Sequence, residues 1–232
     1  MNDLTQAKKL IKDCQDTQNP YLDLGKCGIT NLNELPELFE CKHIETLILS
    51  NSWWDCAEKK QYISNNKGEY NILFTIPKEI SNLEKLTKLI ICGDEGGNWQ
   101  ISDFSFLEKL TNLQYLNLSY NHIYDIIITQ ITDFDGCVID LIKHQISDIS
   151  FLGKLTNLQH LYLAGSNIYD FSFIKNLTSL QYLDLSDNDI HGCGFLENLT
   201  SLLYVDLRCN DISDFRFLKK LPNLQDFDQN PE

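Results

Sequence analysis

The stretch LQYLDLSDNDIHGCGFLENLTSL, residues 180–202, holds one complete copy of a motif that recurs along the chain. Its pattern is L-x-x-L-x-L-x-x-N-x-I, and Leu183 and Leu185 alternate as in a short strand that buries every second side chain. Asn188 follows where the chain must turn, and its amide can satisfy backbone groups of a neighbouring copy. One copy cannot bury its own apolar face, so the motif predicts a stack of similar units.

The copies are regularly spaced in the second half of the chain. From Leu158 onward they start 22 residues apart, and a degenerate copy starts 22 residues earlier, at Gly136, with His144 in the position of the motif Asn. We therefore predict nine parallel strands in register. Their apolar pairs are Leu22/Leu24, Leu47/Leu49, Leu89/Ile91, Leu116/Leu118, Ile139/Leu141, Leu161/Leu163, Leu183/Leu185, Val205/Leu207 and a partial unit at Leu224/Phe227.

The first half of the chain departs from this spacing in two places. Insertions near residues 53–72 and 95–99 follow the second and third predicted strands, and they hold all three tryptophans of the chain. Residues 1–18 contain an amphipathic segment that predicts an N-terminal capping helix, because the first coil of a stack needs a cover. Residues 19–232 form the predicted solenoid, and the fold class is α/β.

Composition narrows the classes of function. The 19 basic and 33 acidic residues give a formal net charge of −14, which argues against binding to nucleic acid or to an anionic membrane surface. The sequence shows neither a signal peptide nor an apolar run long enough to span a membrane, so we expect a cytoplasmic protein. The eight cysteines show no C-x-x-C pair and no metal-finger spacing, which predicts free thiols and no metal site. We expect no cofactor.

The phrase ISDFSFLEKLTNLQYLNLSYNHI, residues 101–123, resembles the 22-residue repeats of bacterial internalins and related leucine-rich-repeat proteins, and this resemblance extends over residues 101–228. The earlier phrases LDLGKCGITNLNELPELF and TIPKEISNLEKLTKL are similar to the repeats of bacterial Roco-type proteins. The resemblance implies a right-handed horseshoe whose parallel sheet lines the concave face, and a role in binding other proteins. The chain carries no G-x-x-x-x-G-K-[ST] phosphate loop, so the GTPase activity of Roco proteins is not implied.

The residues that flank each buried leucine should point outward on the concave face. One predicted column carries aromatic side chains with polar tips, a composition that interfaces favour; it contains Tyr115, His160, Tyr182 and Tyr204, with Tyr162 in the adjacent column. The adjacent column also carries a ladder of carboxylates, Asp184, Asp206 and Asp228. The ladder can be a solvated structural feature, a surface for a basic partner or, least favoured, a catalytic or metal site.

The insertions predict a second part of the binding surface. Trp53, Trp54 and Trp99 would form an exposed aromatic patch beside Ile48 and Ile90, which are apolar where other copies mostly carry Asp or Asn. The alternative is that the tryptophans fold back and pin the insertions onto the solenoid.

Taken together, these patterns predict a non-enzymatic module that binds another protein through its concave face and the insertions. An alternative is an acidic inhibitor or regulator of a basic enzyme or toxin, and a hydrolase that uses the concave carboxylates is less favoured. The last strand lacks a following coil in the pattern, so a homodimer through the C-terminal edge is a further expectation.

Overall fold

The computed structural model describes residues 4–93, 99, 101, 103–121, 149–168 and 170–229, together with the backbone of 124–132 and 138–146. Its main element is an eight-stranded parallel sheet of three-residue strands. The strands, in sheet order, are β1 (Tyr21–Asp23), β2 (Thr46–Ile48), β5 (Lys88–Ile90), β6 (Tyr115–Asn117), β9 (His160–Tyr162), β10 (Tyr182–Asp184), β11 (Tyr204–Asp206) and β12 (Asp226–Asp228).

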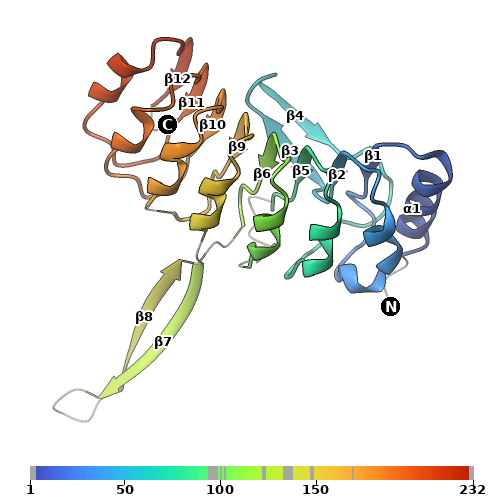
Figure 1. Cartoon of the computed structure of the whole chain (residues 1–232). Coiled ribbons are helices and arrows are strands. Elements are labelled where there is room, and N and C mark those ends of the chain that lie inside the picture. The colour runs from blue at the N-terminus through green and yellow to red at the C-terminus, as the bar shows by residue number, and fades with distance from the viewer. Residues whose placement is uncertain are drawn as a thin grey trace.

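Short 3-10 helices return the chain from one strand to the next along the convex side (Figure 1). Their bounds are η1 (Leu32–Glu34), η2 (Pro36–Glu40), η3 (Lys78–Asn82), η4 (Ser105–Lys109), η5 (Ser150–Lys154), η6 (Ser172–Asn176), η7 (Gly194–Leu196) and η8 (Arg216–Lys220). Between strands and helices lies one continuous core, in which the motif leucines such as Leu161, Leu183 and Leu185 are fully buried. The predicted solenoid is confirmed.

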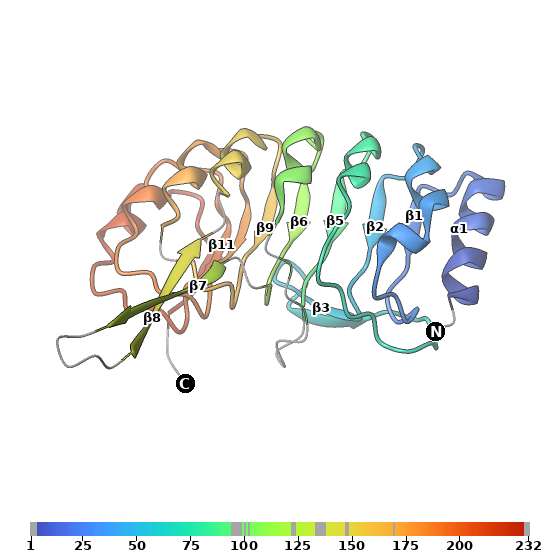
Figure 2. The ribbon, with the colours of Figure 1, turned by 90° about the horizontal axis from the view of Figure 1, so that it is seen from below.

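The predicted N-terminal cap is also confirmed. Helix α1 (Thr5–Thr17) lies against the first coil (Figure 2) and buries Ala7, Ile11 and Cys14 there. These three positions belong to one stripe of the helix, so its apolar face covers the end of the stack while its lysines face water.

The motif asparagine bonds neighbouring coils to each other. The Asn188 side-chain amide donates to the carbonyls of Leu163 (2.9 Å) and Leu185 (3.0 Å), and its oxygen accepts from the backbone N–H of Ile168 (3.0 Å). Asn71 does the same with the carbonyls of Leu24 and Leu49, both at 2.8 Å. Asn71 is therefore the motif Asn of the second coil, and residues 52–70 are the insertion that precedes it.

The prediction of nine strands is wrong by one. Strands β7 (Tyr124–Thr132) and β8 (Val138–Ile146) pair antiparallel as a hairpin, and β6 pairs directly with β9. Ile139 and Leu141, predicted as a repeat strand, lie in β8. Figure 1 shows this hairpin projecting from the solenoid.

The sequence around the hairpin explains the error. If residues 124–146 are removed, the chain reads NHI-SDISFL, which has the spacing of NDISDFRFL at residues 210–218. The hairpin is therefore an insertion between Ile123 and Ser147. Its 23 residues are only one more than the 22 of a repeat, so the period seemed to continue across a segment that is not a repeat.

Candidate protein-binding surface

The insertion of the second coil folds over the concave face of the sheet. It forms a hairpin of β3 (Ser52–Asp55) and β4 (Lys60–Ile63), paired antiparallel, which we call the concave hairpin. Figure 1 shows it on the side of the sheet opposite to the helical turns. The parallel strands beneath it supply its contacts.

The contacts of the concave hairpin extend across most of the sheet. Within the hairpin, Trp53 stacks on Tyr62 with ring centres 5.5 Å apart. At the end of β3, Asp55 Oδ2 accepts from the Tyr115 hydroxyl on β6 at 3.2 Å. At the turn, the Cys56 thiol points to Asp184 Oδ2 on β10 at 3.6 Å. The hairpin therefore connects β2, from which it emerges, with strands far along the solenoid.

The tip of the hairpin reaches the last strand. Lys59 Nζ lies 2.5 Å from Asp226 Oδ2 on β12 and 5.5 Å from the centre of the Tyr204 ring on β11. A carboxylate and an aromatic face together form a favourable surrounding for an ammonium group.

The exposed tryptophan patch that the sequence predicted is not found. Trp53 and Trp99 are buried, as are Ile48 and Ile90, and only Trp54 is exposed, at 41%. Trp99 donates from Nε1 to the carbonyl of Asn71 at 3.1 Å. The physical reason is that the concave hairpin folds onto apolar Ile48 and Ile90, so these residues form a small second core together with Trp53. Trp53 and Trp99 instead follow the alternative prediction, because both are buried and hold the insertions against the solenoid.

The predicted aromatic column exists. Because β6 pairs directly with β9, no residue of the predicted strand at Ile139 and Leu141 separates Tyr115 from His160. The strand register places Lys88, Tyr115, His160, Tyr182 and Tyr204 in one row across β5, β6, β9, β10 and β11. Lys88 Nζ lies 3.8 Å from the Tyr115 ring centre, Tyr115 stacks on His160 at 5.1 Å, and His160 stacks on Tyr182 at 4.7 Å. Tyr115 and Tyr204 are buried, whereas Lys88, His160 and Tyr182 remain half-exposed beside the hairpin.

The carboxylate ladder also exists, and its members differ in surroundings. The register places Asp184, Asp206 and Asp228 side by side on β10, β11 and β12. Asp206 is buried and accepts a bidentate ion pair from Arg208, with Nη2 2.6 Å from Oδ2. Asp228 accepts from the Tyr204 hydroxyl at 2.7 Å.

Asp184 has no such cation. It is buried and accepts from the N–H and hydroxyl of Ser186, and no Lys, Arg or His of the described residues forms an ion pair with it. Burial, and then the charge of Asp206, raise the pKa of Asp184 to about 6. Asp184 is therefore a carboxylate at neutral pH, but its charge is poorly compensated.

The thiol, phenol and imidazole groups in this region, unlike the carboxylates, are held in their neutral forms. Burial raises the pKa of the Cys56 thiol, and the charges of Asp184 and Asp206 raise it further. Burial likewise raises the pKa of Tyr115, Tyr162 and Tyr204, and it lowers the pKa of His160. A cysteine nucleophile needs a depressed pKa, so this arrangement suits recognition better than covalent catalysis.

An open cavity of about 700 Å³ separates the concave hairpin from the carboxyl ends of strands β5 to β11. Trp53, Trp54 and Gln61 line it from the hairpin, and Asn117, Tyr162, Asp184 and Arg208 are among the residues that line it from the sheet. Among the described residues that line this cavity, Trp54 carries the one large exposed ring.

Sequence reasoning did not single out Asp55, Cys56, Lys59 or Lys88. The missed signal is the pair of segments SWWD and KQYI around a short polar turn, which is the pattern of a β-hairpin rather than of a loop. The second insertion, near 95–99, lies outside the described residues except for Trp99.

Comparisons with known proteins agree with the fold. Residues 178–220 match the family model described as Leucine Rich repeats (2 copies), and residues 109–128 match the model described as Leucine Rich repeat. The chain therefore contains leucine-rich repeats. No curated protein matches its sequence significantly.

Solved structures of other leucine-rich-repeat proteins superpose on it. An internalin (InlF) from Listeria monocytogenes is 23% identical with a TM-score of 0.63, and the match covers 97% of this chain and 62% of the internalin. Internalin C2 (InlC2) from the same organism is 25% identical with a TM-score of 0.56, over 90% of this chain and 80% of the other. The plant peptide hormone receptor RGFR1, in complex with RGF2, is 20% identical with a TM-score of 0.52, over 84% of this chain and 26% of the receptor.

Two further observations concern metal-binding groups and membrane-spanning helices. Within the described ranges, no group of three or more His, Cys, Asp or Glu residues could hold a metal ion. No helix among the described residues is long and apolar enough to cross a membrane.

Proposed function

We propose that this leucine-rich-repeat protein is a non-enzymatic module that binds a partner protein through its concave face. The observation that carries the proposal is the half-exposed row of stacked side chains Lys88, His160 and Tyr182, with Tyr115 buried between Lys88 and His160. Stacked rings with polar tips lose little conformational freedom on binding and supply both apolar area and hydrogen bonds. Trp54, which lines the neighbouring cavity from the hairpin side, adds an exposed aromatic anchor.

The fold supports the same proposal. One of the similar structures is a receptor in complex with a peptide hormone, and repeat proteins offer extended concave surfaces for such ligands. The described cysteines are unpaired, which supports a location in a reducing compartment such as the cytoplasm. The homodimer through the C-terminal edge at β12 stays a prediction.

A second candidate is an acidic inhibitor or regulator of a basic enzyme or toxin. It is favoured by the exposed Asp226 at the end of the sheet and by the net charge of −14. This candidate predicts that association slows steeply as salt is added, because long-range attraction between charged surfaces is screened.

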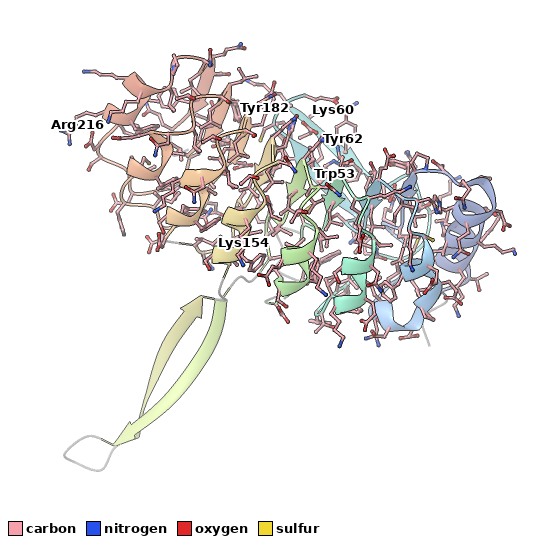
Figure 3. All side chains as sticks on the ribbon, in the orientation of Figure 1. Trp53, Lys60, Tyr62, Lys154, Tyr182 and Arg216 are labelled. Carbon is pink, nitrogen blue, oxygen red and sulfur yellow. The ribbon has the colours of Figure 1, made fainter. Side chains whose placement is uncertain are left out.

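The test is affinity capture from the native lysate with wild-type protein and three variants as baits. Tyr182→Ala should lose the partner, since truncating a central ring of an interface costs ~2 kcal/mol or more, about a thirtyfold loss of affinity. Lys154→Ala and Arg216→Ala are matched controls, because both side chains are exposed, on η5 and η8, away from Tyr182 (Figure 3). Equal capture by all four baits would count against a concave site.

A further inference from the structure

The concave hairpin is held firmly at its base. Ser64, just after β4, donates its hydroxyl to both carboxylate oxygens of Asp23 at 3.0 Å, and its N–H donates to the carbonyl of Asn51 at 2.9 Å. Asn71 closes the insertion with its buried bonds to Leu24 and Leu49. These bonds belong to the solenoid itself, so the base cannot leave the sheet without breaking the second coil.

The tip is held by weaker contacts. The Lys59–Asp226 ion pair joins side chains that are 59% and 50% exposed, and exposed pairs contribute about 0–1 kcal/mol. The Cys56 thiol is a weak donor, and its sulfur lies 3.6 Å from Asp184. These contacts hold the tip less firmly than the buried hydrogen bonds hold the base.

The sheet under the tip is unusual for a surface that is permanently covered. It presents Tyr204, Asp184 and Asp206, all buried, where a dedicated core would present aliphatic side chains. Asp184 has no cation, and Lys59 bonds Asp226 rather than Asp184. The hairpin thus leaves part of the negative charge of this surface uncompensated.

We propose that the concave hairpin is an intramolecular occupant of a docking surface on β10, β11 and β12, and that a partner protein displaces its tip by placing a basic side chain where Lys59 lies. The surface consists of Tyr182, Asp184, Tyr204, Asp226 and Asp228. The part of the partner that replaces the tip is an extended segment with lysine or arginine side chains. This inference rests on the proposed function and names the chemistry of the partner and the element that guards the site.

Charge and geometry favour this occupant. Lys59 shows that an ammonium group fits between Asp226 and the Tyr204 ring, at 2.5 Å and 5.5 Å respectively. A longer basic segment can place a second cation near Asp184, which the hairpin does not. The net charge of −14 also attracts a basic segment from a distance.

Cys56 is a native reporter of the tip. It is 2% exposed while the hairpin is closed, and burial keeps it a poorly reactive thiol. Lifting the tip exposes the sulfur and removes the neighbouring carboxylates that raise its pKa. The rate at which Cys56 reacts with iodoacetamide, followed by peptide mass spectrometry, therefore measures how often the tip opens.

The first arm of the experiment uses the full chain with Lys59→Glu. The new carboxylate would face Asp226 and Asp228, so we expect Cys56 to react at least about fivefold faster than in the wild type. Lys60→Glu is the matched control: it makes the same charge change one residue away, and Lys60 lies over Tyr62 within the hairpin. Cys41 and Cys193, buried in the main core, report global unfolding and should stay protected in both variants.

The second arm uses a hexalysine peptide added to the wild-type protein at low salt. It should raise the Cys56 rate, and a hexaglutamate peptide should not. Unchanged Cys56 rates in Lys59→Glu and with hexalysine would overturn the inference. Equal acceleration of Cys193 would also overturn it, because the opening would then be global. If the tip stays closed while Tyr182→Ala still loses the partner, the inference fails and the proposed function stands.

Discussion

Two hairpins are inserted into this solenoid, and one packs against the sheet whereas the other projects away from it. The concave hairpin follows β2 and folds back over the sheet, where Trp53 and Asp55 make contacts with the solenoid and with Tyr62 of the hairpin itself. The β7–β8 hairpin follows β6 and projects from the solenoid (Figure 1). The strands on either side of both insertions pair in register, β2 with β5 and β6 with β9. An insertion is thus compatible with the stack whichever way it folds, and its own residues decide whether it joins the core.

The largest expected effect distinguishes packed from unpacked residues of the concave hairpin. Trp53→Ala should lower the free energy of unfolding by ~3 kcal/mol, because it leaves a cavity beside Ile48 and Ile90. Trp54→Ala, the matched control at the next residue, should cost less than ~1 kcal/mol since Trp54 is 41% exposed. Chemical denaturation measures both. Equal costs would mean that the hairpin does not form part of the core.

A smaller effect should appear in the dependence of stability on pH. The pKa of Asp184 is raised to about 6 in the folded protein, so this group favours folding when protonated, and that contribution is lost as the pH rises through 6. Between pH 5 and pH 7.5 we expect Asp184 to remove on the order of 1 kcal/mol of stability.

Asp184→Asn isolates this contribution, because the amide oxygen can still accept from Ser186. The variant should lose less stability than the wild type between the two pH values, as measured by denaturation at each pH. Identical pH profiles for the two proteins would show that Asp184 is not buried as a charged group.

The smallest effect is expected from the projecting hairpin. Joining Ile123 directly to Ser147 removes residues 124–146 and restores the spacing of residues 210–218. Because β6 already pairs with β9, the free energy of unfolding should change by less than ~1 kcal/mol. A loss of several kcal/mol would show that β7 and β8 support the sheet and that the contrast between the two hairpins does not hold.

The sequence predicted the scaffold because its signals are local and repeated. Leu183, Leu185 and Asn188 each have a position that physics constrains. Apolar residues recur at the two strand positions of the other coils, and Asn71, Asn121 and Asn210 take the position of Asn188 in three of them. The rows of aromatic and acidic side chains followed from strand alternation alone. The false strand at Ile139 and Leu141 arose because the length of the inserted hairpin imitated the repeat length.

The covering of the concave face could not be predicted in the same way. It depends on contacts between residues far apart in the chain, such as Cys56 with Asp184 and Lys59 with Asp226. No periodicity encodes these pairs. The apolar character of Ile48 and Ile90 correctly predicted that other apolar residues cover them. The same apolar positions would be expected whether the cover is a partner protein or a hairpin of the same chain.

The Lys59–Asp226 contact has a mechanical consequence. In a solenoid each coil contacts only its neighbours, so the resistance of the arc to bending comes from the interfaces between adjacent coils. The concave hairpin adds a chord that joins β2, near the start of the arc, to β12 at its end. Bending that widens the arc must first break this chord, so we expect small-angle scattering to show a larger radius of gyration for Lys59→Glu than for Lys60→Glu. Through the hairpin, a surface charge at its tip thus adds a weak contact between distant coils that opposes widening of the arc until the contact breaks.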